Sequence, residues 1–173
     1  MNQPAKSFFN SLLSTPGVSG YEQTVQAVVR EYCEGFGAQL STDLHGNVIA
    51  SINPDAEVRV MLAGHCDQLG LLVSHIDENG FLYFQTVGGW DPQQMVGLNV
   101  QVWTEEGPVP GIISRKAIHL LTPEERKKVA KAKDLWIDIG ASSLEDAASV
   151  VRIGDSVTPM LGFRELRSGL ITG

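Results

Sequence analysis

The sequence of 173 residues has few cysteines, few basic side chains and no long hydrophobic run. Its two cysteines, Cys33 and Cys66, are too few for a disulfide framework, which fits a reducing cytoplasm. No apolar stretch approaches the ~20 residues of a membrane helix, and the N-terminus lacks the pattern of a signal peptide. The 20 acidic residues outnumber the 13 basic ones, which argues against nucleic acid as the main partner. We therefore expect a cytoplasmic protein that binds neither nucleic acid nor membrane.

Several catalytic signatures are missing as well. The sequence contains no His-x-x-x-His, no Cys-x-x-Cys, no phosphate-binding P-loop and no Gly-x-Ser-x-Gly. Apolar residues make up 43% of the chain, so it is not a disordered segment. Its length allows one domain with a sizeable core, or one domain that carries a smaller insert.

The first 65 residues alternate between helix and strand patterns. Residues 5–13 predict a short helix, and a capping box from Ser19 to Glu22 predicts that a second helix opens there and ends near Gly35. Strands are expected at residues 47–52 and 58–63. The second of these is apolar on both faces apart from one arginine, which is typical of a strand buried in a helix-covered sheet.

After His65 the pattern changes to short strands with turns between them, which predicts a small barrel or sandwich and no helix before residue 114. Two short helices follow, one opened by a capping box at Thr122 with a proline after it and one capped by Ser142 or Ser143. The strands are expected at residues 69–76, 81–87, 99–104, 109–114, 134–139 and 150–159. The fold class is therefore α/β with a β-rich insert: residues 1–67 form the first α/β part, 68–158 the insert, and 159–173 the return.

The sharpest chemical signal is His65-Cys66-Asp67, which directly follows the predicted buried strand. In extended backbone His65 and Asp67 point to the same side and Cys66 points away. Imidazole is the commonest protein metal ligand, and a carboxylate usually fixes its tautomer. His65 is therefore a candidate metal ligand with Asp67 as its orienting carboxylate. The alternative is a local hydrogen-bonded pair without a metal, with Cys66 as a buried free thiol.

Three other features remain open at this stage. The glycine-rich loop around Trp90 is either a functional loop or a turn with the tryptophan packed inward. The charged stretch 124–133 is either a basic patch or, with Glu124 and Glu125 pairing with Lys128, a solvated helix face, which we favour. The remaining histidines lack a partner at metal-ligand spacing and are expected to be solvated or satisfied in the core; they are His45, His75 and His119.

Seven segments in the same order resemble the glutamyl/deblocking aminopeptidase family, the tetrahedral (TET) co-catalytic metallopeptidases, of which some members are labelled endoglucanases or cellulases. The Gly64–Leu71 segment resembles the family's first metal motif. The others are Asp43–Val48, Val87–Gln93, Val109–Ile113, His119–Arg126, Leu135–Ala141 and Ile153–Val157. Together they span nearly the whole chain.

The resemblance implies a metallo-exopeptidase α/β catalytic domain interrupted by a β-barrel-like insert for lid and assembly functions, and hence a homo-oligomer. It implies removal of N-terminal amino acids from peptides by a metal-activated water, with two divalent metals, zinc or cobalt, and a glutamate as general base. His65 would be a metal ligand and Asp67 the catalytic carboxylate that orients it.

Two departures from the family pattern matter. Gln68 stands where the family's His-x-Asp-Glu motif has a glutamate, which we expect to tune the site. The bridging aspartate, the other ligands and the general base of the family have no counterpart among these residues, so we expect this chain to match the N-terminal half only. Because each metal needs several protein ligands, His65 alone cannot complete a two-metal site. The alternative is a non-catalytic assembly or binding module derived from such an enzyme. Glycoside hydrolysis ranks last, because no carboxylate pair stands out.

Overall fold

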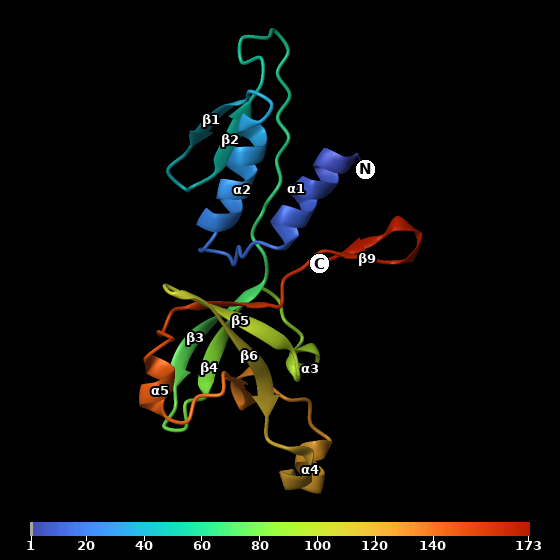
Figure 1. The fold of residues 1–173 in the computed structure, drawn as a ribbon. Helices are drawn as coiled ribbons and strands as arrows, with labels where there is room; N and C mark the ends of the chain where they lie inside the picture. The colour runs from blue at the N-terminus through green and yellow to red at the C-terminus, as the bar shows by residue number, and fades with distance from the viewer. Residues whose placement is uncertain (1) are drawn as a thin grey trace. The chain divides into compact units, whose positions relative to one another are not determined.

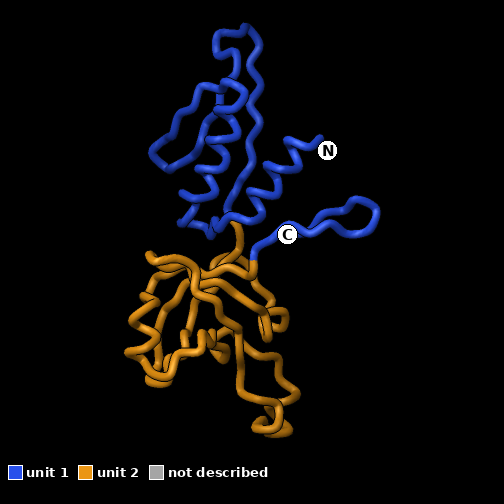
Figure 2. Tube along the Cα trace, in the orientation of Figure 1, with its two compact units in different colours: residues 1–67, 161–173 blue, residues 68–160 orange. Residues whose placement is uncertain are grey.

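The computed structural model describes residues 2–173, which divide into two compact units (Figure 2). The first, the α/β unit, comprises Met1–Asp67 and Leu161–Gly173; the second, the barrel unit, comprises Gln68–Met160. Among residues 2–173 no helix has both the length and the apolar character that crossing a membrane requires.

The α/β unit contains two helices and two small hairpins (Figure 1). Helix α1 spans Gln3–Leu13 and α2 spans Gln23–Glu34; strands β1 (Gln39–Thr42) and β2 (Val48–Ser51) pair antiparallel. Near the C-terminus β9 (Arg164–Glu165) pairs with β10 (Ile171–Thr172), with the 3-10 turn Arg167–Gly169 between them. The predicted helices and the strand at 47–52 are thus present, within a few residues.

Aromatic contacts join the helices of the α/β unit. The ring of Phe8 on α1 stacks on Tyr32 of α2 with centroids 3.9 Å apart, and Phe9 meets Phe163 edge to face at 6.2 Å. The hydrophobic side chains buried in this unit are only Val18 and Val25 among the residues that the structure describes. Two small side chains are a very limited core for a unit of this length.

The strand predicted at residues 58–63 is wrong for this structure. These residues, named here the unpaired segment, lie outside every helix and strand and run on from the β1–β2 hairpin toward Asp67 (Figure 1). Val58, Val60, Met61 and Leu62 are between 78% and 93% exposed. A strand needs hydrogen-bonding neighbours, and within residues 2–173 β1 and β2 pair only with each other.

The capping box predicted at Ser19 is also wrong. Helix α2 begins at Gln23 with Glu22 at the N-cap, and no side chain caps it. The Glu22 carboxylate instead accepts a hydrogen bond from the backbone N–H of Gly20 at 2.7 Å. The Ser19 hydroxyl instead donates a hydrogen bond to the carboxylate of Asp67.

The barrel unit is a closed six-stranded barrel in the order β3-β4-β7-β6-β5-β8, with β8 pairing back onto β3. This confirms the predicted barrel-like β segment and decides against the sandwich. All adjacent strands are antiparallel, and closure leaves the barrel without a free edge. The strands are β3 (Gly70–Ile76), β4 (Leu82–Val87), β5 (Asn99–Thr104), β6 (Gly107–Arg115), β7 (Leu135–Asp138) and β8 (Ser156–Pro159).

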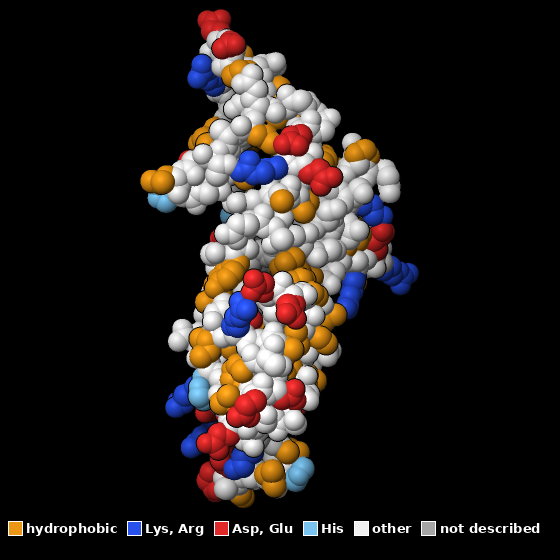
Figure 3. Space-filling view, turned by 60° about the vertical axis from the view of Figure 1, so that its left-hand side comes forward, with side chains coloured by type: hydrophobic (Ala, Val, Ile, Leu, Met, Phe, Trp, Pro, Cys, Tyr) orange, Lys and Arg blue, Asp and Glu red, His pale blue; other side chains and the backbone are white. Residues whose placement is uncertain are grey.

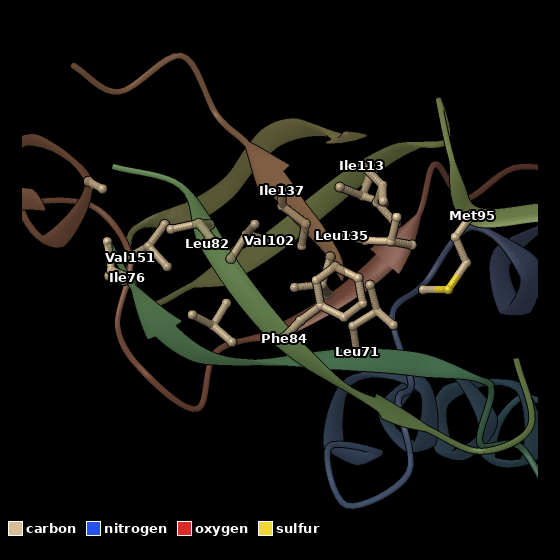
Figure 4. Close-up of a cluster of buried hydrophobic side chains, with 14 residues drawn as sticks. Leu71, Ile76, Leu82, Phe84, Met95, Val102, Ile113, Leu135, Ile137 and Val151 are labelled. Carbon is tan, nitrogen blue, oxygen red and sulfur yellow. The ribbon is translucent and has the colours of Figure 1, made fainter. Parts of the chain in front are cut away.

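Alternate side chains of these strands fill the barrel interior. Figure 4 shows the cluster of 14 buried residues, among them Leu82, Val102 and Ile137. Leu82, Val102, Leu135 and Ile137 are fully buried. A Cβ placed on Gly111 of β6 would lie 2.7 Å from Ile137 Cγ2, so β6 approaches β7 through the missing side chain.

Three short helices decorate the barrel unit. The capping box at Thr122 and the Ser143 cap are confirmed, and they open α4 (Pro123–Arg126) and α5 (Leu144–Ala148). The expectation of no helix before residue 114 is wrong by one turn, because Asp91 caps α3 (Pro92–Met95). Single 3-10 turns lie at Ile118–Leu120 and Ala132–Asp134.

The structure decides the Trp90 alternative in the barrel unit and corrects the charge pairs predicted for the stretch 124–133. Trp90 packs against the core cluster and donates its indole N–H to the carbonyl of Gly70 at 3.0 Å, so it is a packed residue. The charged stretch is exposed, but α4 ends at Arg126 and Lys128 lies beyond it. The predicted pairs with Lys128 are therefore wrong, and Glu125 pairs with Lys116 at 3.3 Å.

Candidate metal-binding site

The candidate site lies where the unpaired segment ends, and its centre is a histidine–aspartate pair. Nδ1 of His65 lies 2.8 Å from Oδ1 of Asp67. When Nδ1 carries the proton it donates to the carboxylate, and Nε2 keeps its lone pair for a metal. The His65 side chain is 84% exposed, so Nε2 is open to further ligands.

Ser19 fixes the other oxygen of the carboxylate. Its hydroxyl lies 2.6 Å from Oδ2 of Asp67, so both oxygens of Asp67 are engaged. The Ser19 hydrogen bond first, and the His65 ring second, hold the pKa of Asp67 below its usual range. The ionised carboxylate is the form that orients an imidazole.

The backbone around the pair is held closely within the α/β unit. A Cβ on Gly17 would lie 2.7 Å from Cγ1 of Val25 and 3.5 Å from the carbonyl oxygen of Cys66. The missing side chain of Gly17 therefore lets the turn before α2 pack against Val25, whereas the distance to the Cys66 carbonyl is an ordinary van der Waals contact. In this turn Ser19 lies within hydrogen-bond distance of Asp67.

Cys66 lies between the two residues of the pair, and Gln68 follows them in the sequence. Burial, followed by the charges of Glu22 and Asp67, raises the pKa of the Cys66 thiol. Cys66 is a free, protonated thiol at neutral pH and a poor third ligand. The amide nitrogen of Gln68 is buried without a hydrogen-bond partner. A glutamate in its place, as in the family motif, would bring a second charge beside the pair.

The residues present provide one metal ligand, His65, together with the Asp67 and Ser19 side chains that hold it in place. They do not form a complete metal site. Within residues 2–173 no group of three His, Cys, Asp or Glu side chains is arranged to hold a metal ion. The other histidines are exposed: His45 lies in the β1–β2 turn, His75 on β3 and His119 in a 3-10 turn. Within residues 2–173, His65 is thus the histidine whose ring is hydrogen-bonded to an aspartate.

Sequence reasoning brought His65 and Asp67 together correctly but missed Ser19. The sequence pattern around Ser19 is ambiguous, because a serine three residues before a glutamate is typical of a helix cap. Ser19 precedes Asp67 by 48 residues, and only the fold brings the two side chains together.

Comparison with known proteins identifies the family. The profile of the M42 glutamyl aminopeptidases matches residues 46–173. The chain is 34% identical over 154 residues to FrvX of Escherichia coli (strain K12), covering 88% of this chain and 43% of FrvX. It is also 34% identical over 149 residues to a lysyl aminopeptidase of Pyrococcus furiosus, covering 83% of this chain and 42% of that one. The chain therefore spans less than half the length of these relatives.

Solved structures agree with the sequence matches. A TET aminopeptidase from a marine sediment archaeon (Thaumarchaeota archaeon SCGC AB-539-E09) superposes with a TM-score of 0.90 at 38% identity, over 97% of this chain and 48% of that chain. The PhTET1-12s dodecamer gives 0.81 at 32%, over 96% and 48%. An endoglucanase of Thermotoga maritima gives 0.75 at 32%, over 91% and 46%. The chain, an α/β fold with a β-barrel unit, belongs to the M42 glutamyl aminopeptidase family.

Proposed function

We propose that this chain is part of a metal-dependent aminopeptidase that removes N-terminal amino acids from peptides. The observation that carries the proposal is the His65–Asp67 pair, held by Ser19 and left open at Nε2, in a chain of the M42 family. An imidazole oriented by a carboxylate is the ordinary form of a metal-binding histidine. A glycoside hydrolase would instead need two carboxylates across a sugar cleft.

In this proposal each residue of the site has a distinct role. His65 would hold one of two divalent metals, zinc or cobalt, through Nε2, and Asp67 would fix the ring and its tautomer. Ser19 would hold the carboxylate in place. When bound, such a metal polarises a carbonyl and lowers the pKa of water to ~7. The remaining ligands and the general base come from the part of the fold that this chain does not span.

The two units would have different functions. We assign residues 1–67 and 159–173 to the α/β catalytic domain and residues 68–158 to an insert with lid and assembly functions. A homo-oligomer formed through the insert is supported by relatives that form a dodecamer and, for TET1 of Pyrococcus horikoshii, a tetrahedron or octahedral shell. A cytoplasmic location is supported by the two free thiols.

The test is hydrolysis of a panel of aminoacyl chromogenic substrates. The 173-residue chain is assayed alone and joined to the remaining half of a TET relative, with added zinc or cobalt and with a chelator. We expect chelator-sensitive turnover only in the joined form. His65→Ala should abolish it, whereas His45→Ala, which removes an exposed histidine of the β1–β2 turn, should not. Equal activity of the His65→Ala and parent proteins would overturn the assignment.

A second candidate is a non-catalytic assembly or binding module. It is favoured by the completeness of the barrel unit, which has a closed sheet and its own core, beside a site with a single supported ligand. Under this alternative the joined protein forms oligomers but shows no chelator-sensitive turnover with any substrate. Sedimentation analysis beside the hydrolysis assay therefore separates the two functions.

A further inference from the structure

Positive charge in this acidic chain is concentrated in one stretch of the barrel unit. Residues 115–133 contain seven of the 13 basic residues of the chain and only two acidic ones, Glu124 and Glu125. The whole chain carries a net charge of −7, and acidic and basic side chains lie interspersed on the face drawn in Figure 3. The stretch therefore has a charge opposite in sign to that of the chain as a whole.

The fold gathers four of these basic side chains around one open hollow of the barrel unit. The hollow, named here the basic hollow, has a volume of about 380 Å³, and no acidic residue lines it. Its basic side chains are those of Arg115, Arg126, Lys127 and Lys128. Within residues 2–173 none of these four side chains takes part in an ion pair or a hydrogen bond.

An ion pair beside the basic hollow holds α4 close to the end of β6. Arg115 is the last residue of β6, and the next residue, Lys116, pairs with Glu125 of α4 at 3.3 Å. The Glu125 carboxylate also accepts the backbone N–H of Thr122 at 2.7 Å, which fixes it at the start of the helix. The residues that follow these tied positions in space, Arg115 and Arg126, therefore line the same hollow.

The opposite wall of the basic hollow is anchored to the barrel backbone. Gln93 of α3 and Val96, which follows α3, line this wall. The backbone N–H of Gly97 donates to the carbonyl oxygen of Ile113 on β6 at 2.8 Å. The N–H of Ile113 donates in turn to the carbonyl oxygen of Leu98 at 2.9 Å, so α3 is held against β6.

The charges of the basic hollow call for an anion with several negative charges. Four unpaired cations around one concavity repel one another, and a bound anion would remove this repulsion. An arginine guanidinium can donate two parallel hydrogen bonds to one phosphate or carboxylate, and a lysine adds a point charge. A carboxylate carries a single charge, whereas a phosphate group carries about −1.5 to −2 and three acceptor oxygens.

The size of the basic hollow favours a compact ligand. Small-molecule sites typically measure about 300–1,000 Å³, and the basic hollow lies in this range. The carboxylates of an acidic peptide alternate sides along an extended backbone, so a hollow of this size would meet only some of them. We propose that the basic hollow binds a small oligophosphate, either inorganic or the phosphate chain of an organic molecule. The site lies wholly in the barrel unit and does not depend on the proposed peptidase function.

Titration of the metal-free 173-residue chain with tripolyphosphate tests the proposal. Calorimetry at low salt should give saturable one-to-one binding that weakens as salt is added, because exposed charges are screened. Amide NMR should place the largest shifts at residues 93–97, 113–116 and 126–130. A nucleoside triphosphate is titrated in parallel, and the ligand that binds more tightly identifies the inorganic or the organic source.

Matched charge variants make the test specific. Arg115→Gln and Arg126→Gln should each weaken tripolyphosphate binding at least ~10-fold, as expected for the loss of a charged hydrogen bond. Lys133→Gln removes the same charge from the same stretch but outside the hollow, and it should change the affinity less than ~3-fold. Tryptophan-monitored urea midpoints equal to that of the parent show that each variant is folded.

Three results would overturn the proposal. The first is binding that does not saturate. The second is equal weakening by Arg115→Gln, Arg126→Gln and Lys133→Gln, which would show attraction to the stretch in general. The third is a triglutamate peptide that binds as tightly as tripolyphosphate, which would identify an acidic peptide as the ligand.

Discussion

The two units differ in how many of their apolar side chains are buried. The barrel unit closes its sheet and encloses its own cluster of hydrophobic residues (Figure 4). The α/β unit buries only Val18 and Val25 among its described residues, although it contains an apolar segment as hydrophobic as any barrel strand. Hydrophobic composition therefore does not produce a core unless the chain also supplies the surfaces that the side chains can pack against.

The largest expected difference between the units is in proteolysis. Trypsin should cut after Arg59, in the unpaired segment, at least ~100-fold faster than after Arg115 of β6, because cleavage requires locally unfolded backbone. Timed digestion with mass spectrometry measures both rates. Comparable rates at the two sites would show that the barrel opens as readily as the segment.

Truncation of leucines sharpens the comparison. Leu82→Ala removes a fully buried side chain of β4 and should lower the free energy of unfolding of the barrel by about 2–5 kcal/mol. Leu62→Ala removes a leucine side chain of the α/β unit that is 93% exposed. It should change the free energy of unfolding of that unit by no more than about 0.5 kcal/mol. Urea unfolding followed by far-UV circular dichroism reports on both units, and Trp90, Trp103 and Trp136 report on the barrel alone. A cost for Leu62→Ala as large as that for Leu82→Ala would mean that residue 62 is packed in solution.

A smaller effect is expected where two barrel strands approach each other. Gly111→Ala places a methyl group against Ile137 and should destabilise the barrel by about 1–3 kcal/mol through overpacking. The matched control is Gly89→Ala in the same unit, where an added Cβ meets nothing within 4 Å. Tryptophan-monitored urea midpoints compare the two, and equal midpoints would contradict the close approach.

The smallest expected effect is on the stability of the barrel unit at low pH. The pKa of Asp146 is lowered by the backbone N–H of Ser142 at 2.9 Å and then by its hydroxyl at 3.1 Å. A lowered carboxyl pKa stabilises the fold above the ordinary aspartate value of about 3.9, and this contribution is lost as the pH falls through the folded value. Asp146→Asn should therefore reduce the loss of tryptophan-monitored stability between neutral pH and about pH 3.

Asp43 provides the control in the other unit. Its pKa is lowered by the side chain and then the backbone N–H of Asn47, and it lies in the β1–β2 turn. Asp43→Asn should leave the tryptophan-monitored acid response unchanged, because the hairpin belongs to the α/β unit. A response equal to that of Asp146→Asn would show that the two units unfold together.

The sequence predicted best those elements whose partners lie nearby in the chain. The barrel strands, the Thr122 capping box and the His65–Asp67 pair all depend on period-two patterns or on short spacings, and all are present. The segment at 58–63 was predicted as a strand from its own residues, but strand formation also requires neighbours, which local composition does not report. Ser19 was assigned to a cap because its true partner, Asp67, lies 48 residues away.

The pairing of β3 with β8 has an evolutionary consequence. These are the first and last strands of the barrel, and they lie side by side with Leu71 opposite Val157 and Leu72 opposite Ser156. The chain therefore enters and leaves the barrel at adjacent points, so a host protein is interrupted at essentially one place. A gene can gain, lose or exchange such a unit by a single insertion or excision, and a short linker would close the gap that remains.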